Sequence, residues 1–154
     1  MKELHLTKCV FSDVDIRSGL VQKRKLGAFI QQLIFTYTKK NSALSYNFVQ
    51  DETLAQMNRD YLQHDTLTDI ITFDLSEKKS TMVLADIYIS VDRVKENALS
   101  LGIKYSTELL RVIIHGALHL SGFCDKTKKE KENIRKLEDD WMQKYLNNNS
   151  SNNK

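Results

Sequence analysis

Two histidines, His115 and His119, lie four residues apart, a spacing that would allow both side chains to bind one metal ion. On a helix they would differ by about 40° around the axis, so their rings would project from one face one turn apart. Gly122 follows, where a left-handed glycine can turn the chain back and bring Asp125 to the same side. Two imidazoles and one carboxylate are a ligand set of catalytic zinc, whose fourth position stays open for water. The sequence therefore predicts one zinc ion per chain, held by His115, His119 and Asp125.

Two alternatives to this ligand set stay open. A histidine on an apolar helix face is more often a core residue that hydrogen-bonds to a backbone carbonyl than a ligand. Two unpartnered rings in apolar surroundings would be costly, however, and this favours the metal. Cys124 is the rival third ligand, because zinc also binds thiolate. We rank Asp125 first and interpret Cys124 as a small buried hydrophobe.

The residue that follows the first histidine limits the reaction. Metalloproteases with the pattern His-Glu-x-x-His use that glutamate as general base, whereas this chain has Gly116 there. A glycine also leaves room over the metal for a bulky group such as a phosphodiester. Asp69 and Glu108 are candidates for hydrogen-bond partners of the metal ligands or for proton carriers. The alternative is a purely structural role, in which Asp69 caps a turn and Glu108 stabilises the N-terminus of its helix. The catalytic residues stay unassigned.

The segment that carries the histidines, residues 106–122, has almost no polar side, which is typical of a helix buried at the centre of a domain. Ser106 is expected to cap it at the start and Gly122 to end it. Apolar periodicity predicts further helices over residues 18–40 and 91–101, and strands over residues 4–11, 44–48, 70–73 and 82–89. Strands mixed with helices without strict alternation indicate an α+β fold, with a small sheet covered by helices.

Local sequence signals predict the boundaries of three helices. Asp51 is a good N-cap for a short helix whose apolar stripe comprises Leu54, Met57 and Tyr61. Ser90 is expected to cap the helix over residues 91–101, and Gly102 to end it. A capping box of Thr127 and Glu130 opens the last helix, whose inward stripe comprises Ile134, Leu137, Trp141 and Tyr145.

The composition fits one domain over residues 1–146. The chain has 154 residues, 41% of them apolar and 28% charged, and its last eight, the Asn/Ser-rich residues 147–154, are expected to be disordered. No signal peptide or membrane-spanning stretch is visible, so we expect a cytoplasmic protein with no membrane partner and with Cys9 and Cys124 as thiols. The formal charge of +3 permits contact with nucleic acid but does not argue for it alone.

Residues 115–123 read HGALHLSGF, which resembles the YbeY signature H-G-x-L-H-L-x-G followed by Tyr or Phe. Upstream, residues 68–73 (TDIITF) and 86–90 (DIYIS), together with Asn58, Tyr61 and Asp65, are similar to further family motifs. The resemblance covers about residues 44–125. It implies an α+β fold of about four mixed strands with a zinc site on the central helix. It also implies zinc-dependent, single-strand-specific endoribonuclease activity in late small-subunit ribosomal-RNA processing and ribosome maturation.

Three residues depart from the family pattern. Asp125 stands where the family usually has a histidine as third zinc ligand, and a carboxylate oxygen can fill the same corner of a tetrahedron. Leu62 stands where the family tends to have an arginine thought to contact RNA, and leucine cannot grip a phosphate. Ala85 replaces the usual glycine before Asp86.

The resemblance implies ribosomal RNA or the small ribosomal subunit as partner, with ribosomal or assembly proteins as further partners. A rival hypothesis is a non-catalytic ribosome-assembly factor that binds RNA or protein and uses the metal only to fold. A small metalloprotease is a third hypothesis, which Gly116 disfavours.

Overall fold

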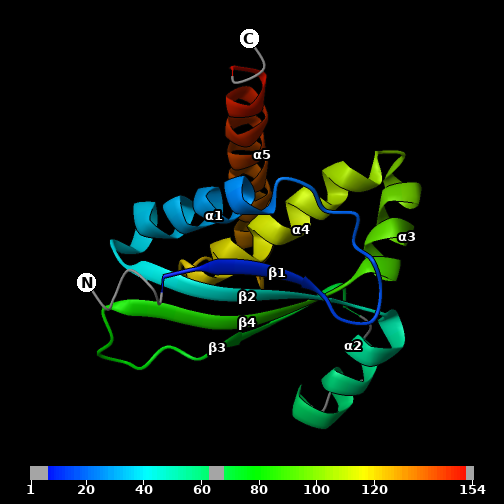
Figure 1. Cartoon of the computed structure of the whole chain (residues 1–154), viewed down its shortest axis with the longest axis horizontal. Helices are drawn as coiled ribbons and strands as arrows, with labels where there is room; N and C mark the ends of the chain where they lie inside the picture. The colour runs from blue at the N-terminus through cyan, green and yellow to red at the C-terminus, as the bar shows by residue number, and fades with distance from the viewer. Residues whose placement is uncertain (1–6, 63–67, 152–154) are drawn as a thin grey trace.

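The centre of the molecule is a four-stranded sheet in the order β1-β2-β4-β3 (Figure 1). The computed structural model describes residues 7–62 and 68–151. The strands are β1 (Cys9–Asp13), β2 (Asn41–Val49), β3 (Ile70–Asp74) and β4 (Met82–Ser90). β1, β2 and β4 are parallel, whereas β3 pairs antiparallel with β4. The predicted α+β fold with a small mixed sheet of about four strands covered by helices is confirmed.

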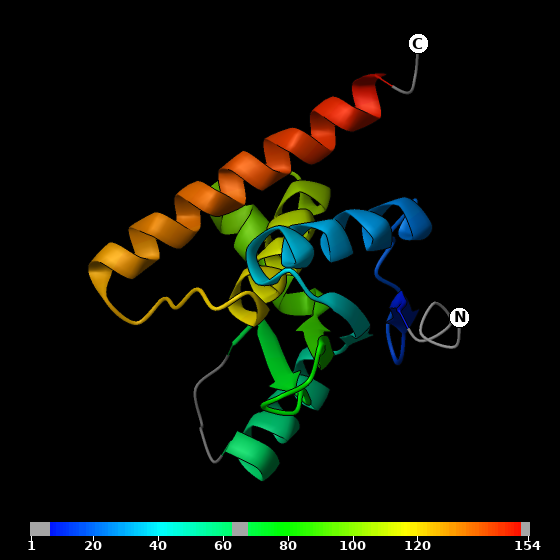
Figure 2. The same ribbon diagram turned by 90° about the vertical axis from the view of Figure 1, so that its left-hand side faces the viewer.

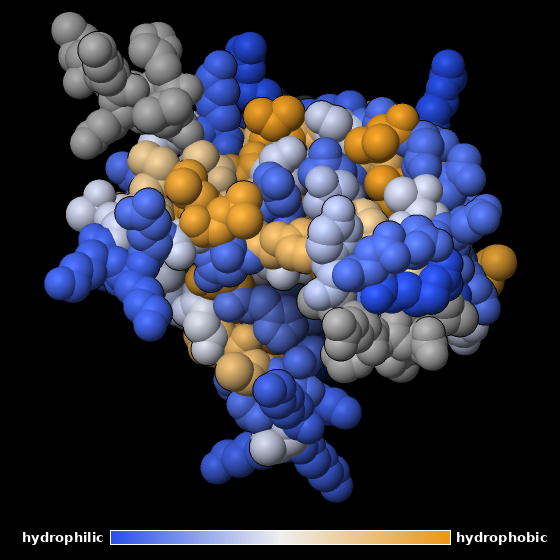
Figure 3. Space-filling model, turned by 90° about the horizontal axis from the view of Figure 1, so that it is seen from below, coloured by the Kyte–Doolittle hydropathy of each residue, from blue (hydrophilic) through white to orange (hydrophobic). Residues whose placement is uncertain are grey.

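Alternating side chains give the sheet one buried face. In β2 the buried residues Leu44, Tyr46 and Phe48 alternate with half-buried neighbours, and β4 repeats this pattern. Two helices, α1 (Lys23–Thr38) and α4 (Tyr105–Leu120), pack on this face, and α5 (Lys128–Ser151) packs on them from outside (Figures 1 and 2). Apolar residues also gather among hydrophilic ones on the lower side of the molecule (Figure 3).

Three shorter helical elements lie at one end of the sheet. The strand β2 leads into α2 (Asp51–Met57) and a π-helical turn, η1 (Asn58–Leu62), and β4 leads into α3 (Val91–Leu101). Leu54 packs against Val49 and Ile71 in a small second core. Tyr61, predicted on the buried stripe of this helix, is 69% exposed, because the chain passes into η1 and the side chain no longer follows the α-helical spacing.

Several predicted boundaries hold. The Ser90 hydroxyl accepts a hydrogen bond from the Arg93 N–H at 3.1 Å, and Gly102 ends α3 with φ 67°. The capping box is present, since the Thr127 N–H donates to Glu130 Oε1 at 2.9 Å and the Glu130 N–H donates to Thr127 Oγ1 at 3.1 Å. Local sequence signals therefore set both ends of α3 and the start of α5.

Other boundaries differ from the prediction. The helix predicted from Ser18 begins at Lys23, because Gly19 (φ 73°) and Gln22 (φ 55°) have left-handed backbones. Ser106 is not a cap: α4 begins at Tyr105, and the Lys104 position before it provides no side-chain hydrogen bond. The first strand covers residues 9–13 rather than 4–11, and residues 4–6 lie outside the described residues.

The sequence predicts disorder from Asn147, but α5 continues to Ser151, and residues 152–154 lie outside the described residues. A helix that has formed extends at little cost, since each added residue gains a hydrogen bond. Gln143 also donates from its side-chain amide to Asn147 Oδ1 at 3.0 Å, one turn along. Within residues 7–62 and 68–151, no helix combines the length and apolarity needed to span a membrane.

Candidate metal centre

The helix α4 is held on the sheet by apolar packing and by one buried hydrogen bond. Tyr46, fully buried in β2, donates from its hydroxyl to the Ile113 carbonyl at 2.8 Å. A Cβ at Gly116 would lie 2.9 Å from Ile70 Cδ1, so this glycine faces the sheet. The interpretation that Gly116 leaves room over the metal is therefore wrong; its small size allows close packing of α4 on β3 and β4.

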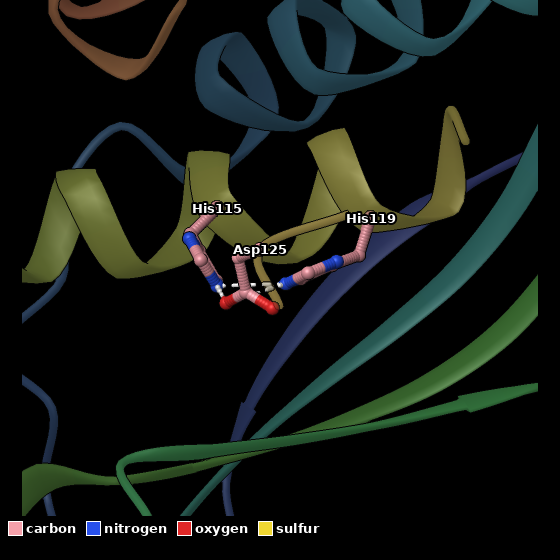
Figure 4. A group of neighbouring side chains, drawn as sticks. All are labelled: His115, His119 and Asp125. Atoms are coloured by element: carbon pink, nitrogen blue, oxygen red, sulfur yellow. Dashed lines mark hydrogen bonds and ion pairs between the residues drawn. The ribbon is translucent and has the colours of Figure 1, made fainter. Parts of the chain in front are cut away.

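A tight turn after α4 returns the chain toward the histidines. Gly122 adopts φ 103°, a backbone that other residues rarely adopt, and the Phe123 N–H donates to the Leu118 carbonyl at 3.1 Å. The chain then runs back beside the last turn of α4, and Asp125 points at both imidazoles (Figure 4). The predicted turn at Gly122 and the predicted approach of Asp125 are both present in the structure.

The three side chains form a small triangle of potential ligand atoms. The Nε2 atoms of His115 and His119 are 2.9 Å apart, and Asp125 Oδ2 lies 3.4 Å from each of them (Figure 4). Ligands placed about 2.0–2.1 Å from a tetrahedral zinc ion are separated by about 3.3 Å. The spacing therefore fits a single first-row metal ion, and this group could bind one.

Hydrogen bonds on the far side of each ring fix which nitrogen faces the triangle. His115 Nδ1 donates to Glu138 Oε2 at 2.8 Å, and His119 Nδ1 donates to the Phe123 carbonyl at 2.8 Å. A carbonyl and a carboxylate only accept, so both rings carry their proton on Nδ1 and present an Nε2 lone pair. Two lone pairs and a carboxylate oxygen that face one another repel unless a cation lies between them.

The surrounding charges also favour a cation. Burial by itself lowers the pKa of His115, but the hydrogen bond and charge of Glu138, with the charges of Asp125 and Asp69, raise it above 6.5. Glu138 is almost fully buried, and Arg111 Nη1 lies 3.5 Å from its Oε1 atom. The same guanidinium pairs with Asp139 at 3.0 Å and with Glu108 at 3.4 Å. Arg111 is therefore held by three carboxylates, and negative charge remains at the triangle.

A pocket of about 350 Å³ opens beside the triangle, between α4, the first half of α5 and the residue before β3. Asp69 lines it and accepts a hydrogen bond from the Asn97 amide at 3.4 Å; burial raises the pKa of its carboxyl. Glu108 also lines it, and burial raises its pKa although Arg111 opposes this. Both predicted candidates therefore lie near the triangle, but neither bonds to a histidine.

Comparison with known proteins gives the family. A family model described as Endoribonuclease YbeY matches residues 14–146. The chain belongs to the YbeY family. Endoribonuclease YbeY of Cytophaga hutchinsonii is 56% identical over 96 residues, which are 62% of this chain and 66% of that protein. Endoribonuclease YbeY of Parabacteroides distasonis is 43% identical over 118 residues, which are 77% and 82% of the two chains.

A solved structure extends the likeness to the fold. The solution structure of a Thermotoga maritima protein superposes with a TM-score of 0.56 at 25% identity, over 93% of each chain. The family predicted from residues 115–123 is confirmed, and with it the prediction of an enzyme, since YbeY proteins are named endoribonucleases.

Within this YbeY chain, two residues at the centre escaped sequence reasoning. Glu138 orients His115, and Arg111 holds Glu138, yet neither is a predicted site residue. A signal for Glu138 existed, because it stands between Ile134 and Trp141 on the inward stripe of α5, where a charged residue is unusual. Arg111 gave a weaker signal, as one of two charged residues, with Glu108, on a mostly apolar helix.

The structure describes the side chain of Cys124 but not that of Leu62. Cys124, interpreted as a small buried hydrophobe, is exposed, because the turn that points Asp125 inward points its neighbour outward. It is not part of the group of described residues that could hold a metal ion. Leu62 ends η1, but its side chain and Asp65 lie outside the described part of the chain.

Proposed function

We propose that this chain is a zinc-dependent endoribonuclease that cleaves single-stranded RNA, with one zinc ion held by His115, His119 and Asp125. The observation that carries the proposal is the triangle of two Nε2 atoms and one carboxylate oxygen, 2.9 and 3.4 Å apart. The family name supports RNA as substrate. Imidazole nitrogen with a single carboxylate suits zinc better than magnesium or calcium, which prefer sites made of oxygen.

Each residue of the centre has a distinct role in this proposal. Zinc supplies Lewis acidity, which stabilises charge on a phosphoryl oxygen and activates water near neutral pH. Glu138 and the Phe123 carbonyl keep the Nδ1 protons in place, so that both Nε2 atoms stay free to bind. Asp69 is the candidate to carry a proton, because it lines the same pocket and burial raises the pKa of its carboxyl, whereas Glu108, which shares both features, is paired with Arg111.

The biological setting follows from the substrate. We propose that the RNA is the small-subunit ribosomal RNA, processed late in ribosome maturation in the cytoplasm, with the small ribosomal subunit and its assembly proteins as partners. Relatives named as endoribonucleases in two bacteria support this role for the chain. Residues 1–146 would then act as one zinc-hydrolase domain.

A cleavage assay tests the proposal. Zinc-loaded protein is incubated with a labelled single-stranded RNA, and the rate is expected to fall by about 100-fold or more in His119→Ala or after chelation. Cys124→Ala is the matched control and should cleave at the wild-type rate. Cleavage that survives both chelation and His119→Ala would contradict the proposal. A zinc-loaded protein that binds RNA without cleaving it would favour a non-catalytic assembly factor.

A further inference from the structure

A short segment beside the metal centre has a high net positive charge. The basic segment, residues 126–136, contains six lysine and arginine residues and two glutamates. Its net charge of +4 exceeds that of the whole chain, which is +3. Positive charge is therefore concentrated at one place on a chain that is otherwise close to neutral.

The position of this charge opposes the stability of α5. The helix begins at Lys128, so the lysines lie in its first turns, while its last turn has no basic residue. The N-terminus of a helix carries partial positive charge, and cations there are unfavourable. Helix stability therefore does not explain the basic segment, whereas an anionic ligand would be attracted by the lysines and the helix dipole together.

The basic side chains are available to such a ligand. Lys126, Lys131 and Arg135 are exposed, and in the part of the chain that the structure describes none of them forms an ion pair. Glu130, next to Lys131 in sequence, is occupied by the capping box with Thr127. The three side chains are therefore free of ion pairs within the described residues, although burial raises the pKa of the Glu108 carboxyl and the charge of Arg135 acts against that rise.

Two of these side chains face the metal centre. Lys131 and Arg135, one turn apart and about 6 Å along the axis, line the pocket that also contains His115 and Asp125. Lys131 lies seven residues before Glu138, on the same side of α5. Figure 2 shows the start of α5 beyond the end of α4, next to the loop that carries Asp125. Arg111 lines the same pocket but is held by three carboxylates, so it is not free to bind phosphate.

We propose that Lys126, Lys131 and Arg135 bind consecutive phosphates of an RNA strand and guide it along the start of α5 to the triad of His115, His119 and Asp125. This inference rests on the proposed function, because it takes RNA as the substrate. Four carboxylates also line the pocket and repel phosphate, so the strand contacts the exposed Lys131 and Arg135, and its scissile phosphate alone reaches the metal. Phosphate contacts of this kind are independent of base sequence.

Salt-dependent RNA binding tests the proposal. A short labelled single-stranded RNA is titrated by fluorescence anisotropy against chelator-treated protein, which binds without cleaving, over a range of NaCl concentrations. The double variant Lys131→Ala/Arg135→Ala should bind about ten-fold more weakly at low salt, and its slope of log Kd against log salt should fall by about 1.4, or about 0.7 per lost contact. The matched control is Lys78→Ala/Lys79→Ala, which removes two exposed lysines between β3 and β4, away from the pocket. It should change the affinity by less than about two-fold.

The outcomes separate this inference from the proposed function. If the double variant binds RNA more weakly as expected, but zinc-loaded wild type does not cleave RNA, the inference is supported and the proposed activity is overturned. If zinc-loaded protein cleaves RNA, but the affinity for RNA and the salt slope are the same in wild type and in Lys131→Ala/Arg135→Ala, the inference alone is overturned. Equal losses in the test and control variants would also overturn it, because binding would then follow net charge rather than this surface.

Discussion

At the scale of residues, the centre depends on what lies behind the histidines as much as on the histidines themselves. His115 is oriented by a side chain 23 residues away, and His119 by a backbone carbonyl four residues away. Both acceptors place the proton on Nδ1, which leaves Nε2 to bind a metal. The two rings thus reach the same tautomer through different parts of the chain.

Replacement of Glu138 by glutamine should weaken the centre without removing a ligand. The amide in Glu138→Gln would keep an acceptor for His115 Nδ1 but lose the negative charge, so zinc affinity is expected to fall by about ten-fold. Competition with a zinc-binding dye measures this. Asp139→Asn, which removes an exposed partner of Arg111, is the control and should change the affinity by less than about two-fold. Equal effects of the two variants would show that Glu138 acts only through net charge.

The raised pKa of Glu108 predicts that the free energy of unfolding depends on pH. Burial raises the pKa of its carboxyl above 4.5, so the ionised form destabilises the folded state at neutral pH. Glu108→Gln should therefore have a larger free energy of unfolding than wild type at pH 7. This advantage should disappear as the pH falls below 4.5, where wild type is protonated in both states. Urea unfolding at pH 7 and pH 4 tests this; a variant less stable than wild type at pH 7 would show that the pair with Arg111 outweighs burial.

The ligand triangle could be predicted from sequence because its parts are close in the chain. The spacing of His115 and His119 and the glycine before Asp125 are local signals, and geometry follows from them. Glu138 could not be placed in the same way, because its contact depends on how α5 packs against α4. Exposure of Cys124 likewise depends on the direction of a turn, which a hydropathy pattern does not encode.

At the scale of elements, the turn between α4 and α5 is the part that builds the centre. Its conformation depends on Gly122 at φ 103°, around which a Cβ would meet no atom within 4 Å. The strain of a side chain there would come from the backbone alone.

Gly122→Ala should destabilise the protein by about 1–2 kcal/mol and also weaken zinc binding, because the turn carries Asp125. Gly102→Ala is a matched control: Gly102 also has positive φ (67°) and open space, but it lies at the end of α3. It should lower stability by a similar amount and leave zinc affinity unchanged. Thermal melting and dye competition on both variants decide this. Unchanged zinc affinity in Gly122→Ala would show that the turn does not position Asp125.

Elements with strong periodicity could be predicted, and boundaries set by backbone conformation could not. Alternation in residues 44–48 predicts β2, and the continuous apolar character of α4 predicts a buried helix. The predicted start of α1 is too early because Gln22, which has a helix-compatible side chain, adopts a left-handed backbone. The predicted end of α5 is also too early, because an Asn/Ser-rich composition does not reveal that a helix already formed will continue.

At the scale of the whole molecule, one apolar core joins the sheet to α1, α4 and α5, from Phe11 to Tyr145. The triangle of His115, His119 and Asp125 lies at the edge of this core, and its three residues are only partly buried. The fold is therefore expected to form without metal, unlike a small domain that folds only around zinc.

Removal of the metal should lower the melting temperature without abolishing cooperative unfolding. With zinc at about 100 times its Kd, binding adds about 2.7 kcal/mol, which corresponds to about 5–10 °C for a chain of this size. Scanning calorimetry with zinc and with a chelator measures the shift. Loss of the folding transition in the chelated protein would support the rival assembly factor, in which the metal serves only to fold the chain.

The coordination of one zinc ion by two imidazoles and the Asp125 carboxylate can be tested through the metal content of the protein. Elemental analysis of purified protein should find about one zinc per chain in wild type and in Cys124→Ala, and little in Asp125→Ala. Zinc retained by Asp125→Ala and lost from Cys124→Ala, or no zinc in any of the three proteins, would contradict it.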